Sequence, residues 1–327
     1  MDLPIVFMLL MGVAVLLYVV LDGYDLGVGM LMPAASTGEQ SVMVSSIGPF
    51  WDANETWLVL GIGILLVAFP QAHGVVLGAL YLPVVAMLVG LMFRGVAFEL
   101  RMKALGWHRE LWNALFYGGS FLASFSQGLM LGRYITGFEP GAGYLLFAVV
   151  VGASLCGGYV LLGATWLVYK TEGTLQRKAL AWSRWGLLWV ALGVGLVSLA
   201  TPMVSETVRA KWFDFPRTLA LMALPAACFA AGWAVWWSTG RLAKGAGRDW
   251  HPFAGAVAIF VIAFLGLAFS LFPFVVIDRL TIWEAAAHPS SLRALFWGAL
   301  VVLPFIGAYT AFSYYVFRGK AKAGLYD

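Results

Sequence analysis

The sequence predicts an all-α, polytopic membrane protein with about nine transmembrane helices. Of its 327 residues, 62% are hydrophobic and only 11% are charged, whereas a soluble domain carries about 25% charged residues. The mean hydropathy is +0.88. The 15 Trp and 38 Gly residues fit the aromatic belts and glycine-tolerant helices of bilayer proteins. These observations exclude an ordinary soluble domain.

Nine apolar segments approach the roughly 20 residues that a helix needs to cross a bilayer. The second segment is the weakest on length, and without it the chain would have eight spans. No long polar stretch separates the segments, so we expect one integral membrane domain over residues 1–327. The expected helices lie near residues 4–31, 54–70, 74–100, 112–132, 141–168, 184–203, 216–238, 252–275 and 292–316.

Basic residues predict the orientation of these spans. The alternate loops 101–111, 169–184 and 239–251, with the C-terminal tail, carry 13 of the 20 Lys and Arg residues. Because Lys and Arg collect on the cytoplasmic side, we expect a cytoplasmic C-terminus and, with nine spans, an N-terminus outside. The 32–53 loop is the exception, since it is cytoplasmic in this scheme but has no Lys or Arg. With eight spans, the N-terminus would lie inside.

The first polar motif is DGYDLGVG, residues 22–29, in the inner half of the first span. Asp22 and Asp25 are three residues apart and share a helix face, which must look into the bundle. Gly23 and Gly27 form a small-xxx-small pair that lets another backbone approach closely. Ionisable residues at membrane depth indicate a functional site. The alternative is that Asp25 lies near the interface and pairs with a neighbouring basic group.

The second motif is WDANETW, residues 51–57, at the start of the second span. Asp52 and Glu55 have the spacing of a capping box, and Trp51 and Trp57 would then anchor the interface. A carboxylate that caps a helix at the cytoplasmic interface can also collect protons. We therefore expect these two acids to act in proton uptake as well as in capping.

The third motif is FRGVAFELRMK, residues 93–103, which closes the third span. Glu99 can reach Lys103 at the i,i+4 spacing. The alternative is an ordinary basic helix end that satisfies the helix dipole and the positive-inside rule. Arg94 lies about two turns deeper than this alternative explains. We therefore expect Arg94 to neutralise an acid of the first or second helix.

The alternating directions of the first three helices bring these motifs to the cytoplasmic side. Such an acidic relay, open to the cytoplasm, suits proton uptake. The expected cluster consists of the acids Asp22, Asp25, Asp52, Glu55 and Glu99, balanced by Arg94, Arg101 and Lys103.

Histidine placement argues against a haem in this chain. All four histidines fall in or beside the expected loops, namely His73, His108, His251 and His288. A haem within a helix bundle usually needs a His or a similar axial ligand that faces the core. We therefore expect no haem or metal to be bound by this chain alone.

With these residues in view, the chain resembles subunit II of the bd-type quinol oxidases, in their shorter, cyanide-insensitive branch. The resemblance covers essentially the whole chain and rests on the three motifs above. A fourth match is LFPF at 271–274, followed by LTIWE at 280–284. The resemblance implies a subunit of an electrogenic quinol:oxygen oxidoreductase in the bacterial inner membrane. Such a complex of the aerobic respiratory chain oxidises quinol and reduces dioxygen to water without pumping protons.

The resemblance also implies a partner, the subunit I that holds haem b558, haem b595 and haem d. This chain would scaffold that subunit and conduct protons from the cytoplasm. Asp52 matches the family's acid of the WD motif, Glu99 the acid that closes FRxxxF(D/E), and Lys103 the basic residue after it. Asp22 and Asp25 match the DG(F/Y)D pair, which is linked to assembly or proton transfer. Glu55 stands where the family pattern allows a neutral residue.

The quinone type, a structural quinone or lipid in this chain and a small accessory subunit are undetermined. The alternative function is a proton-coupled secondary transporter, because multi-spanning chains with buried acids are often transporters. The one-sided acids and the lack of an internal repeat count against it. The basic residues sit in short loops, so we expect no nucleic-acid partner.

Overall fold

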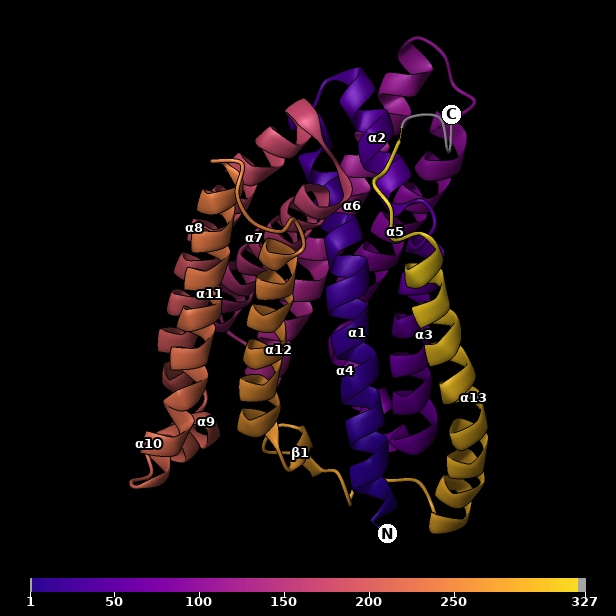
Figure 1. Ribbon diagram of the computed structural model, residues 1–327. Helices are drawn as coiled ribbons and strands as arrows, with labels where there is room; N and C mark the ends of the chain where they lie inside the picture. The colour runs from indigo at the N-terminus through magenta and orange to yellow at the C-terminus, as the bar shows by residue number, and fades with distance from the viewer. Residues whose placement is uncertain (1, 323–327) are drawn as a thin grey trace.

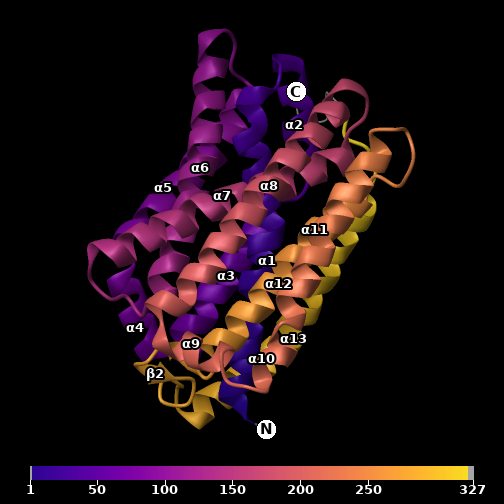
Figure 2. The ribbon, with the colours of Figure 1, turned by 90° about the vertical axis from the view of Figure 1, so that its left-hand side faces the viewer.

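The computed structural model describes residues 2–322, apart from the side chains of Arg217 and Ala220, and this part is almost entirely helical (Figures 1 and 2). The expected all-α class is confirmed. Residues 1 and 323–327 of the expected single domain lie outside the described residues. The long helices run side by side, and the start of α1 lies at the end of the bundle opposite to the end of α13 (Figure 1).

Nine helices of the described chain have 18 or more residues. They are α1 (Leu3–Leu31), α3 (Trp51–Ala68), α5 (Tyr81–Arg101), α6 (Trp107–Ile135), α7 (Ala142–Lys170), α8 (Gly173–Val204), α11 (Ala223–Leu242), α12 (His251–Leu271) and α13 (Pro289–Val316). The shorter elements are η1 (Met32–Ala34), α2 (Thr37–Ile47), α4 (Pro70–Ala79), α9 (Glu206–Trp212), α10 (Arg217–Leu221) and the antiparallel strands β1 (Phe274–Val276) and β2 (Leu280–Thr281).

Seven of the described helices are long and apolar enough to cross a membrane. They are α1, α3, α5, α7, α8, α12 and α13. The 29-residue α6 and the 20-residue α11 lie alongside them but fall outside this criterion. The structure thus supports a polytopic membrane protein, while nine spans and the orientation of the termini stay predictions.

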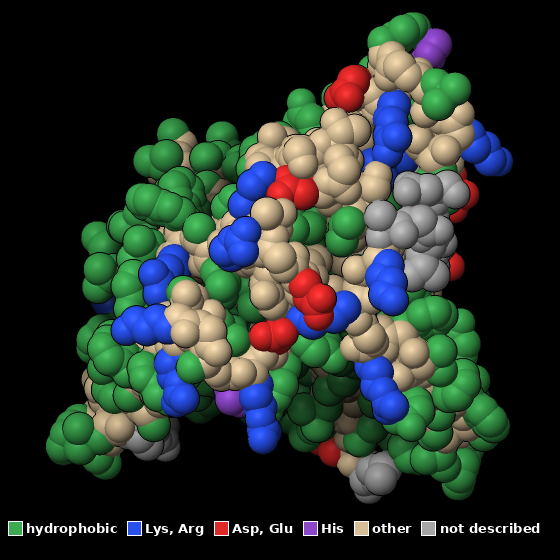
Figure 3. Space-filling view, turned by 45° about the horizontal axis from the view of Figure 1, so that its top comes forward, with side chains coloured by type: hydrophobic (Ala, Val, Ile, Leu, Met, Phe, Trp, Pro, Cys, Tyr) green, Lys and Arg blue, Asp and Glu red, His purple; other side chains and the backbone are tan. Residues whose placement is uncertain are grey.

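The outer surface is strongly apolar. Large side chains such as Leu82, Met203 and Phe229 are 77%, 84% and 76% exposed. In the space-filling view, hydrophobic side chains cover much of the flanks of the molecule (Figure 3). A soluble monomer rarely exposes so much contiguous apolar surface. The surface therefore suits contact with lipid or with another membrane subunit.

The expected helix 74–100 is wrong as a single element. The chain forms α4 and then α5, with a break at Leu80. Pro83 explains the break, because a proline ring inside a helix clashes with the carbonyl four residues earlier and lacks the N–H that would bond to it. Pro83 therefore sits in the first turn of α5, where its missing N–H costs little.

The expected loop 32–53 is also wrong, because it contains α2. Ser36 and Glu39 form a capping box at its start, a signal that was present in the sequence. Glu39 also accepts a hydrogen bond from Lys178 of α8 at 2.6 Å. Lys178, followed by the backbone of Ser36, lowers the pKa of the Glu39 carboxyl to about 2. This pair ties α2 to the start of α8.

Two later boundaries also differ from the expectation. Helix α8 begins at Gly173, so Arg177 and Lys178 lie on the helix and not in a loop. The segment expected as a helix over 216–238 is divided into α10 and α11, and α11 continues to Leu242. The early start of α8 and the late end of α11 extend these helices beyond the apolar segments, because polar residues can continue a helix outside the bilayer.

Helix α1 lies in the middle of the bundle and packs against α3, α6 and α7 (Figure 1). Its closest approach is to α7, where Gly27 faces Gly163. A Cβ atom on Gly27 would collide with the backbone oxygen of Tyr159, and one on Gly23 would lie 2.7 Å from the Tyr159 ring. The small residues at these positions therefore allow the two backbones to touch, as the spacing predicted.

We expect Gly27→Ala to destabilise the folded chain by about 1–3 kcal/mol, because overpacking of a tight contact displaces backbone. The measurement is the thermal unfolding midpoint of the purified protein in detergent. Gly63→Ala on α3 is the matched control, since nothing lies within 4 Å of a Cβ atom added there. Equal midpoints for the two variants would contradict the prediction.

Candidate functional site

Arg94 lies at the centre of a buried polar cluster formed by α1, α3 and α5. Its Nη1 donates to Asp22 Oδ1 at 2.9 Å. Its Nη2 lies 3.8 Å from Asp25 Oδ2, and its Nη1 lies 3.9 Å from Glu55 Oε2. One guanidinium thus faces three carboxyl groups from two different helices.

Helical spacing explains how each residue reaches the cluster. Asp22 and Asp25 share the inner face of α1, three residues apart. Arg94 belongs to the buried stripe of α5, one turn after Leu91 and one before Ala97 and Phe98. Glu55 is next to Asn54, which lies on the buried stripe of α3. The apolar stripes that pack the helices therefore also carry the charged groups inward.

The cluster holds more negative than positive groups. Asp22 and Asp25 are 0% exposed and Arg94 is 1% exposed, while the side chain of Glu55 is 29% exposed. Asp25 Oδ1 and Arg94 Nε have no hydrogen-bond partner among the described residues. Uncompensated buried charge is costly, and such groups tend to take up a proton instead. The arrangement can therefore bind and release a proton.

Asn54 connects this cluster to three hydroxyl and carbonyl groups. Its Nδ2 donates to Asp25 Oδ2 at 2.8 Å and to Tyr24 Oη at 2.9 Å. It also lies 3.2 Å from the carbonyl oxygen of Leu21. Its Oδ1 accepts from Tyr314 Oη at 3.0 Å. A buried amide with all of these partners holds α1, α3 and α13 in one hydrogen-bonded network.

A second buried network lies one helical turn from Asp22 along α1. Gln127 of α6 donates from Nε2 to Tyr18 Oη at 2.6 Å, and its Oε1 accepts from Tyr159 Oη of α7, also at 2.6 Å. Tyr18 and Asp22 are four residues apart and so share a face of α1. Polar groups therefore continue from the Arg94 cluster toward the interior of the bundle.

The structure does not bring the other predicted residues into this cluster. Asp52, Glu99 and Lys103 are exposed in this chain. Asp52 is within electrostatic reach of Glu55, but it lies off the buried stripe of α3. Glu99 follows the buried Phe98 and points away from it. The expectation of a single five-acid cluster is thus wrong: Asp22, Asp25 and Glu55 gather around Arg94, and two acids stay outside.

Two predicted local pairings are also wrong. Asp52 and Glu55 do not cap α3, because the helix already begins at Trp51 and its N-cap is Phe50, without a side-chain hydrogen bond. Glu99 and Lys103 do not form a helical pair, because α5 ends at Arg101. Arg101 is buried, and its Nε donates to Asn113 Oδ1 of α6 at 2.9 Å.

Sequence reasoning did not assign several residues that the structure places in these networks. They are Tyr18, Tyr24, Asn54, Gln127, Tyr159 and Tyr314. Asn54 and Gln127 could have been predicted to join a polar network, because each is an amide within an apolar span and a buried amide needs hydrogen-bond partners. The tyrosines gave no such signal, because many tyrosines in this chain face outward.

The four histidines do not fit the axial ligation of a haem within the bundle. His73 lies in the short α4, and His108 and His251 lie in the first turn of α6 and α12. His288 is the N-cap of α13 and is exposed. In the described part of the chain, no group of three or more His, Cys, Asp or Glu side chains is arranged to hold a metal ion.

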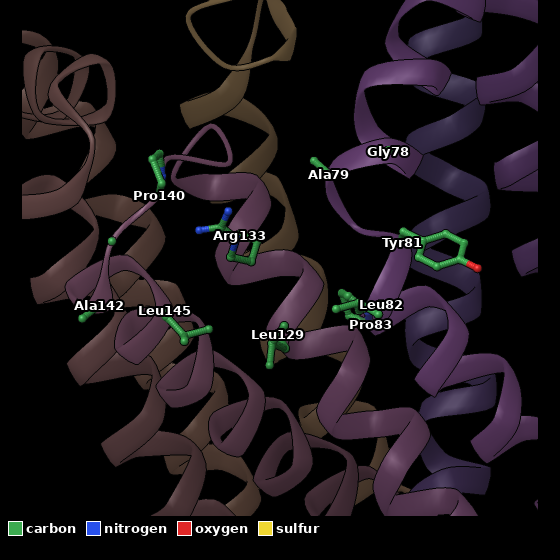
Figure 4. Close-up of a pocket in the computed structure, with 11 residues that line it drawn as sticks. Gly78, Ala79, Tyr81, Leu82, Pro83, Leu129, Arg133, Pro140, Ala142 and Leu145 are labelled. Atoms are coloured by element: carbon green, nitrogen blue, oxygen red, sulfur yellow. The ribbon is translucent and has the colours of Figure 1, made fainter.

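A surface hollow of about 860 Å³ lies near the opposite end of α5 (Figure 4). It lies between Leu82 and Pro83 on one side and Leu129, Arg133 and Leu145 on the other. Arg133 is its charged residue, and Nη2 of this residue donates to the carbonyl of Phe138 at 2.9 Å. Among the described residues, those that line the hollow include no member of the Arg94 cluster, so the two sites are separate.

The end of the molecule nearest the Arg94 cluster is rich in basic side chains. Figure 3 shows this end, with Lys and Arg side chains spread across it. The link between α11 and α12, the start of α8 and the segment after α13 contribute Lys244, Lys178 and Lys320. Basic residues favour the cytoplasmic side of a membrane. The cluster therefore lies toward the basic end of the bundle.

Comparison with known proteins gives a consistent family. The family described as cytochrome bd terminal oxidase subunit II matches residues 3–317. The cytochrome bd ubiquinol oxidase subunit 2 of Bacillus subtilis (strain 168) is 30% identical, over 92% of this chain and 92% of that protein. The cytochrome bd-I ubiquinol oxidase subunit 2 of Escherichia coli (strain K12) is 29% identical, over 95% and 93%.

A solved structure gives a matching fold. The chain is similar to one in the structure of bd oxidase from Geobacillus thermodenitrificans, with a TM-score of 0.76. The match covers 97% of this chain and 99% of that chain, at 17% sequence identity. At this identity the likeness supports the fold alone, and the arrangement of the long helices agrees with it.

Proposed function

Because this chain belongs to the subunit II family of the cytochrome bd terminal oxidases, we propose that it conducts protons from the cytoplasm through the Arg94 cluster. The chain is a subunit of a quinol oxidase complex, and quinol oxidation by dioxygen is the reaction of that complex. In the described part of the chain, the histidines lie in the short α4, in the first turn of α6 and α12 and at the N-cap of α13.

The observation that carries the proposal is the imbalance of charge around Arg94. Two fully buried carboxyls and a half-buried one share a single guanidinium. Ionisable groups at membrane depth mark proton relays. Glu55 is the proposed point of proton entry to the cluster, because its side chain is partly exposed and its carboxyl contacts Arg94. Tyr18 and Gln127 extend polar groups farther inward.

We propose that three exposed residues take up protons at the cytoplasmic end of the pathway: Asp52, Glu99 and Lys103. Asp52 lies on the surface within electrostatic reach of Glu55, so it would pass a proton to that side chain. Glu99 and Lys103 lie at the end of α5, where an exposed acid and a base can exchange protons with water. Arg94 and Arg101 would balance charge from buried positions.

The partner implied by the family is a subunit I, and we propose that it holds haem b558, haem b595 and haem d. The apolar flanks of this chain would scaffold that subunit. In this proposal the chain has nine spans in a bacterial inner membrane, with its N-terminus outside and its C-terminus in the cytoplasm. A small accessory subunit, lipid and quinol are further proposed partners. The family match over residues 3–317 favours this function over a secondary transporter.

The test is Asp52→Asn in the assembled oxidase complex. We expect quinol-dependent oxygen consumption to fall about tenfold or more, because positioned acid–base groups contribute about 10²–10⁴-fold. The haem absorption spectrum of the complex should not change. Glu110→Gln is the matched control, since Glu110 is an exposed acid at the start of α6, near the same end. Wild-type turnover in Asp52→Asn would remove this residue from the pathway.

A further inference from the structure

The last helix is loosely held along most of its length. Of the described residues of α13, Leu292 is the one that is fully buried. The helix packs against α1 and α3 and forms an edge of the bundle (Figure 1). Tyr309 and Phe312, for example, are each 64% exposed. Near its end, however, Tyr314 turns inward and reaches the polar network.

Tyr314 is the point where α13 meets the buried acids. Its hydroxyl donates to Asn54 Oδ1 at 3.0 Å and lies 2.6 Å from the hydroxyl of Tyr24. Because the Tyr314 proton is directed to Asn54, Tyr24 donates to Tyr314. The Tyr314 ring stacks on Phe50, with centroids 4.5 Å apart. Tyr24 stacks in turn on Trp166 of α7, with centroids 4.1 Å apart.

The bond from Tyr314 occupies the accepting end of the Asn54 amide. An amide has one accepting and one donating end. With Oδ1 bound to Tyr314, the Nδ2 group faces Asp25 Oδ2 at 2.8 Å. If the amide turned over, its carbonyl would face the carboxylate of Asp25 and repel it. The Asp25 carboxylate and the Leu21 carbonyl only accept, so they set the orientation of Asn54. Tyr314 completes this arrangement by donating to Oδ1, which holds the amide in the position that donates to an ionised Asp25.

The segment after α13 is clamped to the end of α7 by two lysines. Lys170 Nζ donates to the carbonyls of Phe317 and Gly319, at 2.5 and 2.6 Å. Its ammonium also lies 5.6 Å from the centre of the Phe50 ring. In the opposite direction, Lys320 Nζ of the segment after α13 donates to the carbonyl of Tyr169 on α7 at 2.8 Å. It also donates to Asp249 Oδ2 at 2.6 Å.

These contacts begin three residues after Tyr314, so they limit how far the end of α13 can move. A helix held along its length by few buried side chains would otherwise fray or shift at its end. The clamp thus compensates for the loose packing of α13. It keeps the Tyr314 hydroxyl within reach of Asn54.

We propose that Tyr314 is a positioning residue for Asp25, which acts through Asn54 and is held in place by the clamp of Lys170 and Lys320. The proposal rests on the proposed function, since it needs Asp25 to carry protons. In this proposal α13 carries no proton itself. It assists proton transfer because its Tyr314 keeps Asn54 in contact with Asp25. Tyr314 touches neither quinol nor haem in this proposal.

The principal test is Tyr314→Phe in the assembled complex. We expect kcat for quinol oxidation to fall about three- to tenfold, the factor that corresponds to one lost hydrogen bond. KM for quinol and the haem spectrum should stay unchanged. Tyr309→Phe removes a hydroxyl from an exposed position of the same helix and should leave kcat unchanged. Equal kcat in Tyr314→Phe, Tyr309→Phe and the wild type would overturn the proposal.

Infrared difference spectroscopy separates positioning from general damage. The band to follow is the carboxyl band that disappears in Asp25→Asn. This band should shift in Tyr314→Phe and not in Tyr309→Phe, because only the former removes a hydrogen bond from the amide that donates to Asp25. A fall in kcat with an unshifted band would mean that Tyr314 acts on the structure in another way, and the proposal would fail.

The clamp gives a second variant that does not touch the buried network. Lys320→Met should lower kcat in the same direction as Tyr314→Phe, and the double variant should be no slower than Tyr314→Phe alone, because both changes act on one interaction. If the fall in kcat of the double variant equals the product of the two single falls, Tyr314 and the lysine clamp act independently, and the proposed link between them is wrong. If Asp25→Asn itself turns over like the wild type, the proposed proton pathway fails. If only Asp25→Asn is slow, the pathway stands and this inference fails.

Discussion

Arg94→Met is expected to prevent the folded chain, and with it the assembled complex, from accumulating in the membrane. Arg94 is 1% exposed, and its guanidinium contacts both Asp22 and Asp25. Its removal leaves two fully buried carboxyls without a counter-charge. Breaking a buried ion pair from one side costs about 3–5 kcal/mol. That is a large part of a total stability of about 5–15 kcal/mol.

The measurement is the yield of complex after mild solubilisation, read from its haem absorbance, together with its thermal midpoint. Lys103→Met is the matched control, because Lys103 is an exposed base just beyond the same helix. Adding Asp22→Asn to Arg94→Met should restore part of the yield, since replacing both partners of a buried pair costs less than removing one. A normal yield for Arg94→Met alone would show that the buried acids do not need this cation.

The sequence predicts the fold class and the central charges because both follow from strong local signals. An apolar segment of about 20 residues has the length and composition of a membrane-spanning helix. Asp22, Asp25 and Arg94 are equally visible, because charged residues within such segments must face the protein interior. Gly27 was predicted to allow a close helix contact, and it lies against Gly163.

The remaining errors come from rotation and from packing, which a single sequence does not specify. Asp52 and Glu55 are three residues apart on α3, yet one is exposed and the other reaches Arg94 at 3.9 Å. The buried stripe of α3 passes through Asn54 and Trp57, and only the packed structure defines it. Tyr314 is 260 residues from Asn54. A contact at that separation depends on the whole fold.

Asp25→Asn is expected to separate proton transfer from assembly. The substitution keeps the shape of the side chain and an oxygen that can accept from Asn54 Nδ2, but it removes the ionisable group. Quinol-dependent oxygen consumption should therefore fall about 100-fold, within the range of positioned acid–base groups. The complex should still assemble, because Arg94 keeps its 2.9 Å ion pair with Asp22 and one uncompensated buried charge is gone.

Asp22→Asn is expected to affect assembly more than Asp25→Asn does, because Asp22 is the closer partner of Arg94. It removes the partner that holds Arg94 at 2.9 Å and leaves Asp25 at 3.8 Å. We therefore expect Asp22→Asn to lower the yield and the thermal midpoint, whereas Asp25→Asn lowers turnover at a normal midpoint. Glu110→Gln, at an exposed acid in the first turn of α6, should change neither. The measurements are oxygen consumption per haem and thermal unfolding of each complex. Wild-type turnover in Asp25→Asn would show that protons do not pass through this carboxyl.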